Sequence, residues 1–251
     1  MNKYIRKIFN KIFTHRKIVE SFICQGTDLN IIDTIYPIGK YNIRCIEDDI
    51  GGWYSAVYTD KNMILQPILI NVQKIISLWS IILKEPLNAL VLGCAGCSLV
   101  RFISFQYPKC NIIGIESSDK LIEVAKKYFF LEQYHHFKII HDDAFRFVNN
   151  EEKQSYDIII VDLYLKNEIC QQVFGEEFIT NLYRICNTNA LVVINMFGVQ
   201  THMIKPVAYN KFVKFIVSDR NNSPYLLLIK SNEQNLIDKF SHSLKQHYCI
   251  I

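Results

Sequence analysis

The stretch that decides the fold is Ala89-Leu-Val-Leu-Gly-Cys-Ala-Gly-Cys-Ser-Leu-Val-Arg101. An apolar run leads into a turn of small residues, and a helix-like continuation follows the turn. Gly93 and Gly96 suit a turn at which backbone N–H groups approach a nucleotide. Cys94 and Cys97 also form a CxxC pair, which could be redox-active or provide half of a metal site. The choice between these two interpretations decides most of the function.

Length and composition indicate a globular chain. Half of the 251 residues are apolar, which is enough for one sizeable core with a small additional element. The longest apolar stretches are interrupted by polar residues, so no membrane span is predicted. Of the 28 basic residues, six lie within residues 1–17, where there is no acidic residue. The rest of the chain is therefore slightly acidic.

The basic start is interleaved with Ile and Phe, which predicts an amphipathic helix in the N-terminal segment. Contact with anionic lipid or nucleic acid would explain this pattern, but a solvated helix resting on the body explains it better. No nucleic-acid partner is expected. Eight cysteines at irregular spacing, with no secretory signal, favour a cytoplasmic protein.

From residue 88 onward, short apolar runs alternate with helical periodicity, which is typical of a parallel sheet with crossover helices. The predicted strands are Ala89–Leu92, Asn111–Ile115, Phe137–His141, Asp157–Val161, Ala190–Asn195, Phe212–Ser218 and Tyr225–Lys230. The predicted helices are Ser98–Gln106, Asp119–Leu131, Ala144–Asn150 and Glu176–Ile185. A turn-like composition between the last two strands predicts an antiparallel hairpin. The result is an α/β fold with a Rossmann-like, seven-stranded, mostly parallel sheet.

Before residue 88 the pattern changes. Tyr41–Glu47 and Trp53–Thr59 are predicted to form a β-hairpin, and Leu69–Leu83 a helix that leads into the sheet. The predicted organisation is a basic N-terminal helical segment at residues 1–35, a small β-hairpin element with a linking helix at 36–87, and a Rossmann-like nucleoside-binding domain at 88–251.

Candidate ligand-binding residues follow the carboxyl ends of the strands, where open α/β sheets bind ligands. Glu116, about 20 residues after the glycine turn, is placed to accept both ribose hydroxyls of a nucleoside. Asp143 is placed to accept from an adenine amino group, and Asp162 would face the reacting end of the ligand. The predicted nucleoside site comprises Gly93, Cys94, Ala95, Gly96, Glu116, Ser117, Asp143, Ala144 and Asp162.

Each of these acids also has an ordinary structural interpretation. Glu116 and Asp143 could cap the helices that follow them. However, three acidic strand ends in one sheet repel each other unless hydroxyl, amine or cationic partners are present. Their combination with the glycine turn therefore favours a nucleoside that carries a positive centre.

Residues Gly93–Val199 resemble the spermidine synthase-like branch of the class I AdoMet-dependent methyltransferase fold. The resemblance lies in the glycine loop with Ser-Leu-x-Arg, in Asp143-Ala144, in the strand Tyr156–Asp162 and in the preceding strand Trp53–Asp60. It implies an adenosyl sulfonium co-substrate, either decarboxylated AdoMet or AdoMet, and no metal. It also implies transfer of an aminopropyl group to a small-molecule amine acceptor, and a homodimer.

Val91 bears on which sulfonium is used. Methyltransferases of this fold usually carry an acid two residues before the first glycine, where it binds the amino-acid part of AdoMet. An apolar residue at this position resembles aminopropyltransferases, so Val91 favours decarboxylated AdoMet. An amine nucleophile must lose its proton to attack carbon, and Asp162 is the expected catalytic residue that holds and deprotonates it.

The chain also departs from the family pattern around the acceptor. The aspartate that holds the aminopropyl amine in the family falls on Gly96, and the family's second carboxylate is absent from Asp162–Lys166. The family's tyrosine-glutamine pair falls on Val72 and Gln73, so only Gln73 is expected to bind substrate. Tyr164 is the other expected lining residue of the acceptor pocket.

Three alternatives remain open from the sequence. One is an AdoMet-dependent methyltransferase, and another is a catalytically inactive binding or dimerisation module of the same fold. The third is the redox or metal interpretation of Cys94 and Cys97, which lacks a second CxxC at a recognisable spacing.

Overall fold

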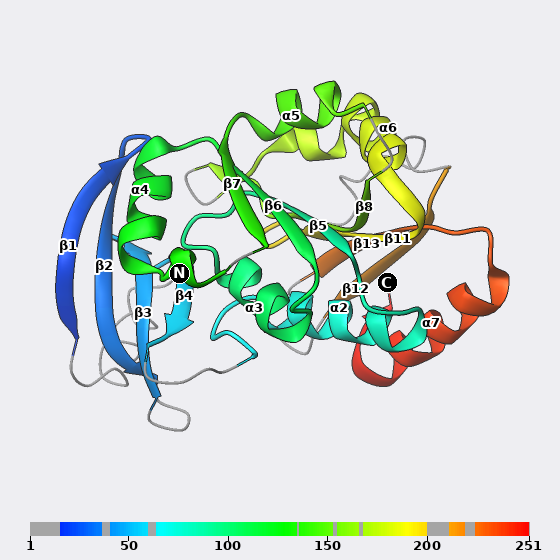
Figure 1. Cartoon of the computed structure of the whole chain (residues 1–251), viewed down its shortest axis with the longest axis horizontal. Coiled ribbons are helices and arrows are strands. Elements are labelled where there is room, and N and C mark those ends of the chain that lie inside the picture. The colour runs from blue at the N-terminus through cyan, green and yellow to red at the C-terminus, as the bar shows by residue number, and fades with distance from the viewer. Residues whose placement is uncertain are drawn as a thin grey trace.

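The computed structural model describes residues 16–36, 41–59, 64–134, 136–152, 155–165, 168–199, 211–218 and 224–250. Two large sheets organise these residues, a four-stranded antiparallel sheet at one end and an eight-stranded mixed sheet in the body (Figure 1), and a third sheet has only two short strands. None of the described helices is long and apolar enough to cross a membrane.

The N-terminal sheet has the order β1-β2-β3-β4. Its strands are β1 (Lys17–Cys24), β2 (Thr27–Tyr36), β3 (Tyr41–Asp48) and β4 (Trp53–Tyr58). The prediction of a helix over residues 1–35 is therefore wrong from Lys17 onward, and residues 1–15 lie outside the described part. The physical reason is a period-two pattern in β1, where Phe22 and Cys24 are buried and Ser21 and Ile23 are exposed. The predicted hairpin β3–β4 is thus half of a larger sheet.

The large sheet has the order β14-β12-β13-β11-β8-β5-β6-β7. Its strands are β5 (Asn88–Leu92), β6 (Asn111–Glu116), β7 (Phe137–His141), β8 (Tyr156–Val161), β11 (Cys186–Asn195), β12 (Val213–Ser218), β13 (Pro224–Lys230) and β14 (Cys249–Ile250). Pairing among β11, β8, β5, β6 and β7 is parallel, and β13 is antiparallel to both of its neighbours. The mostly parallel sheet with an antiparallel hairpin is confirmed, and the two-residue β14 is an additional edge strand.

Helices cover both faces of this sheet. They are α2 (Ile70–Ile82), α3 (Ser98–Gln106), α4 (Asp119–Tyr128), α5 (Ala144–Asn150), α6 (Glu176–Ile185) and α7 (Gln234–His247). Short elements are β9 (Tyr164–Leu165), β10 (Glu168–Ile169) and the 3-10 turns η1 (Leu131–Gln133) and η2 (Gln171–Phe174). Figure 1 shows α5 and α6 on one side of the sheet and α2, α3 and α7 on the other.

The alternation of side chains along the central strand β8 explains these two layers. Ile158 and Ile160 belong to the core under α2, α3 and α7, whereas Ile159 and Val161 belong to the core under α5 and α6. All four side chains are fully buried. A strand that is buried on both faces has a continuous apolar sequence, which is why β8 could be predicted from the sequence.

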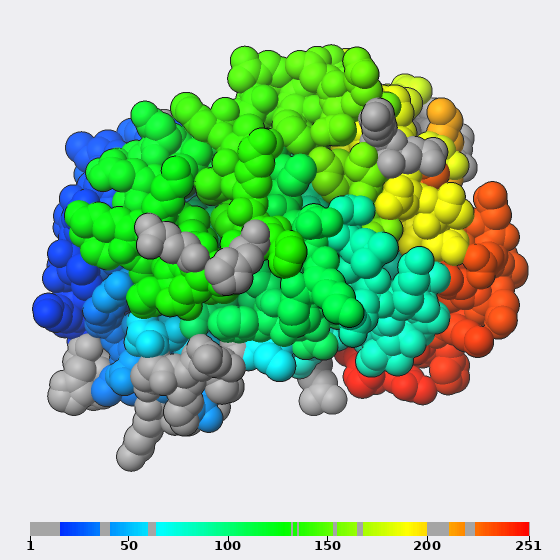
Figure 2. All heavy atoms as spheres, in the orientation of Figure 1, coloured from blue at the N-terminus to red at the C-terminus, as the bar shows by residue number. Residues whose placement is uncertain are grey.

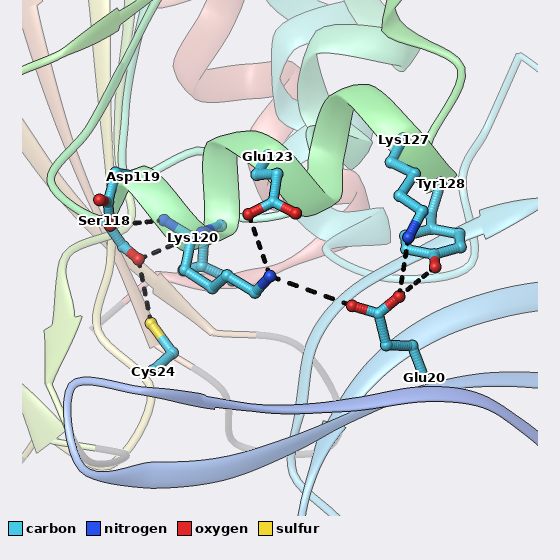
Figure 3. A network of polar contacts seen from close by, with 9 residues as sticks. Glu20, Cys24, Ser118, Asp119, Lys120, Glu123, Lys127 and Tyr128 are labelled. Carbon is cyan, nitrogen blue, oxygen red and sulfur yellow. Dashed lines mark hydrogen bonds and ion pairs between the residues drawn. The ribbon is translucent and has the colours of Figure 1, made fainter.

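The N-terminal sheet packs against α4 through a third apolar cluster and a polar network (Figure 3). Glu20 of β1 accepts from Tyr128 Oη and, at 3.0 Å, from Lys127 Nζ. Cys24 Sγ lies 3.1 Å from Ser118 Oγ at the start of α4. Figure 2 shows the resulting continuous surface, in which the blue residues of the sheet lie against the green residues of α4. The small sheet is therefore fastened to the body at α4.

Replacement of Ser118 by alanine tests its role as the N-cap of α4, the helix to which the small sheet is attached. Its hydroxyl accepts from the backbone N–H of Leu121 at 3.1 Å and so caps α4. Because loss of such a cap costs about 1 kcal/mol, we expect Ser118→Ala to lower the free energy of unfolding by about that amount in chemical denaturation. The matched control is Ser117→Ala, since Ser117 is exposed and does not cap the helix. Equal stability of the two variants would contradict the assignment.

Candidate nucleoside-binding site

The glycine turn after β5 lies directly against the chain that follows β8. Gly93 has φ +84°, and a Cβ at this position would lie 2.3 Å from the carbonyl oxygen of Asp162. Only glycine fits there. Ala95 (φ 43°) and Cys97 (φ 63°) also adopt the left-handed region, which is unfavourable for residues with a side chain. Residues 93–97 thus form a strained turn that its neighbours hold in place.

Glu116 is the neighbour that holds the turn. Its carboxylate accepts from the backbone N–H of Cys94 at 3.2 Å, of Ala95 at 2.9 Å and of Ser118 at 3.0 Å. The side chain is buried, but a carboxylate has about four acceptor positions, so capacity remains for a further donor. The structure therefore brings Glu116 and the turn together as the sequence predicts. Ser117, next to it, is exposed, and its hydroxyl accepts from Gln25 Nε2.

Asp143 and Ala144 lie at the end of the neighbouring strand β7. Asp143 Oδ1 accepts from the backbone N–H of Arg146 at 2.9 Å, so this residue caps α5, while the side chain stays exposed. Ala144 is buried in the core under α5 and α6. The backbone N–H of Asp142 donates to the carbonyl oxygen of Glu116, which places these strand ends side by side. The capping interpretation of Asp143 is observed, and its exposure leaves it accessible to a ligand as well.

Asp162 follows β8 and is held by Asn195, the last residue of β11. Asn195 Nδ2 donates to Asp162 Oδ1 at 2.9 Å. Burial raises the pKa of Asp162 to about 6; the hydrogen bond from Asn195 opposes this rise, and the charge of Glu116 adds to it. Asn195 was missed by the sequence reasoning. The available signal was a polar residue at the end of a buried strand, as with Glu116 and Asp162.

Tyr164 lies two residues beyond Asp162 in β9. Its hydroxyl donates to the carbonyl oxygens of Asn195 and Phe197, at 3.2 Å each. Burial raises the pKa of Tyr164 above its ordinary value, and the nearby charge of Asp162 also raises it. Tyr164 therefore connects β9 to the end of β11 beside Asp162, and Phe197 lies next to it with 63% of its surface exposed.

Gln73 is not part of this arrangement. Its side chain is fully buried in α2, where Oε1 accepts from Gln66 N at 2.8 Å and Nε2 donates to the carbonyl oxygens of Gln66 and Ile68. Every polar atom of the amide is thereby engaged with the backbone of residues 66–68. The prediction that Gln73 binds substrate is wrong for this structure, because the side chain instead orders the segment before α2.

The two cysteines of the turn are packing residues. Cys94 and Cys97 are 6% and 2% exposed. Their mutual hydrogen bond and burial raise the pKa of the Cys94 thiol, which opposes thiolate chemistry. A Cβ at Gly114 would lie 2.5 Å from Cys94 Sγ, so this sulfur rests on the bare backbone of β6. These contacts speak against the redox interpretation.

A small recess lies between the turn and the N-terminal sheet. Its cavity of about 10 Å³ is lined by β4, the two residues before α2, Val91 of β5, the turn, the start of α3 and Asp162. A Cβ at Gly96 would lie 2.8 Å from both Cβ and Oγ of Ser55 and 3.0 Å from Phe129. The position on which the family's aspartate falls therefore has no room for a side chain in this chain.

Known proteins resemble this chain in sequence and in fold. Residues 72–237 match the model of the spermine/spermidine synthase domain. A polyamine aminopropyltransferase of Vibrio vulnificus is 22% identical over 116 residues, which cover 45% of this chain and 39% of that protein. An eEF1A lysine and N-terminal methyltransferase homologue of Drosophila melanogaster is 30% identical over 82 residues, covering 32% of this chain and 12% of that protein. The chain thus matches well under half of the length of either relative.

Among solved structures, a probable spermidine synthase of Corynebacterium glutamicum superimposes with a TM-score of 0.70 at 16% identity. The alignment covers 91% of this chain and 87% of that one, and it shows the shared fold. The chain thus has an α/β fold of the methyltransferase-like kind. Because the family model spans well over half of its length, the chain belongs to the spermine/spermidine synthase domain family.

Gly96→Ala tests the tight packing over the turn. The added methyl group would overlap Ser55 and Phe129, and overpacking of this kind costs roughly 1–3 kcal/mol. We expect a corresponding loss of unfolding free energy in thermal or chemical denaturation. In a double-mutant cycle with Ser55→Gly, the removed Ser55 side chain should relieve part of the loss. Strict additivity of the two substitutions would contradict the contact.

Proposed function

We propose that this chain binds decarboxylated AdoMet at the carboxyl edge of its large sheet and transfers the aminopropyl group to a small amine acceptor. The main support for this proposal is Asp162, whose backbone lies directly against the glycine turn and whose carboxylate is held by Asn195. Membership of the spermine/spermidine synthase domain family supports this choice of reaction.

The nucleoside half of the donor is assigned to the ends of two strands, β6 and β7. One ribose hydroxyl would donate to the acceptor position of Glu116 that its three backbone bonds leave open. Asp143, exposed at the start of α5, would accept from the adenine amino group. Ribose and adenine would then lie along β6 and β7, and the sulfonium would lie toward β8.

The absence of basic residues from the recess favours the decarboxylated donor. Among the described residues that line it, none is Lys, Arg or His, and Asp162 supplies a negative charge. Val91, in the same lining, is buried and apolar. Asp162 would therefore repel the carboxylate of AdoMet, which would find no cationic partner in this lining. The aminopropyl chain of the decarboxylated donor ends in an ammonium group alone, which Asp162 would attract.

The reaction itself is a displacement at carbon. A primary amine acceptor is protonated at neutral pH, and ionised Asp162 would bind the ammonium and take its proton as the nitrogen lone pair attacks. The new C–N bond forms while the C–S bond breaks, and the bonding electrons leave with sulfur as a neutral thioether. Because the sulfonium is already an activated leaving group, orientation and electrostatics supply most of the catalysis.

Titration calorimetry with decarboxylated AdoMet, AdoMet and methylthioadenosine tests which donor is used. We expect decarboxylated AdoMet to bind at least about tenfold more tightly than AdoMet, because one unpartnered carboxylate is avoided. Tighter binding of AdoMet would favour the methyltransferase alternative. Binding of methylthioadenosine without turnover of any amine would favour the inactive module.

The pH dependence of transfer tests the role of Asp162. Only the ionised carboxylate accepts a proton, so activity should rise as the pH increases through about 6. Asp162→Asn should lower the rate by about 10²–10⁴-fold. Asn195→Leu removes a donor that stabilises the charged form, so the rise should move to higher pH. A profile that is the same in the wild type and in Asn195→Leu would contradict this role.

A further inference from the structure

Ser55 occupies the wall of the recess that the N-terminal sheet provides. It lies in β4, is 1% exposed and lines the same cavity as Asp162. Ser98, the first residue of α3, lies opposite it, with the two hydroxyl oxygens 2.5 Å apart. Both serines are therefore buried polar groups whose hydrogen bonds can be accounted for completely.

The hydroxyl of Ser98 has a single proton, and its contacts determine where that proton goes. Ser98 Oγ accepts from the backbone N–H of Ala56 at 3.0 Å and lies 2.8 Å from the carbonyl oxygen of Ala56. A carbonyl oxygen can only accept, so Ser98 donates to it. The contact between the two serines must then be a hydrogen bond that Ser55 donates. Ser55 Oγ has thereby used its proton, and its own lone pairs are left for a donor.

The surroundings select the kind of donor. The described lining of the recess has no basic residue, whereas Asp162 lines it and Glu116 adds its negative charge nearby. A cavity of about 10 Å³ has room for about one water-sized group. A primary ammonium head has this size, carries positive charge and brings three N–H donors.

We propose that Ser55 is a specificity-determining residue, whose hydroxyl oxygen accepts a hydrogen bond from the ammonium group of the aminopropyl chain in the recess. This inference rests on the proposed function, because it assigns one end of the same donor. The bare Gly96 is part of the arrangement, since any side chain there would overlap Ser55. Ser55 then accepts the hydrogen bond from the ammonium group, because the turn has no room for a side chain that could accept it.

The test compares two ligands in the full chain by titration calorimetry. Decarboxylated AdoMet carries the ammonium group, and methylthioadenosine lacks the whole aminopropyl chain. We expect Ser55→Ala to weaken binding of decarboxylated AdoMet by about ten- to a hundredfold, the effect of losing a hydrogen bond to a charged group. Binding of methylthioadenosine should change by less than about twofold, which also reports that the variant is folded.

The control variant is Ser21→Ala, whose hydroxyl is on the exposed side of β1, and it should bind both ligands as the wild type does. Equal weakening of both ligands by Ser55→Ala, or no weakening of either, would overturn the role of Ser55. If the wild type itself did not prefer decarboxylated AdoMet to methylthioadenosine, the proposed donor would fail instead. The two failures are therefore distinguishable.

Discussion

The carboxylate of Glu116 is the interaction on which the rest of the site depends. It binds two N–H groups of the turn after β5 and one N–H group of Ser118 at the start of α4. One buried side chain thereby sets the positions of the turn, of the end of β6 and of the helix that follows. The two bonds to the turn help to hold its non-glycine residues at positive φ.

The N-terminal sheet depends on the same centre. It contacts α4 through Cys24 and Ser118, and it contacts α3 through the hydroxyls of Ser55 and Ser98. Both helices start beside the turn. By packing against them, the sheet closes one side of the recess. The small sheet thus forms one wall of the recess, and in the function that we propose the polarity of that wall helps to select the ligand.

The sequence predicts well what local periodicity determines. Helices α3, α5 and α6 have the predicted bounds, because their apolar residues recur every three or four positions and clear turn residues flank them. Strands β1 and β2 were missed because the basic, Ile-rich start suggested a helix that continued to residue 35. The C-terminal helix α7 was not predicted, although the spacing of its buried residues Leu236, Phe240 and Leu244 carried the signal.

Within the site, the acids at the strand ends were predictable because the topology of parallel sheets brings such ends together. The bonds of individual side chains were not. Asn195 reaches Asp162 across 33 residues of sequence, and the amide of Gln73 binds backbone groups that no pattern identifies. Contacts of this kind depend on tertiary packing, so the hydrogen bond that lowers the pKa of Asp162 was visible only in the structure.

The nucleoside site that we propose combines the turn, Glu116 and Asp162. The most direct test is a crystal structure of the chain with methylthioadenosine. We expect a ribose hydroxyl on the Glu116 carboxylate and the thioether sulfur between the turn and Asp162. A nucleoside bound elsewhere, with Glu116 still bonded only to backbone N–H groups, would contradict the account.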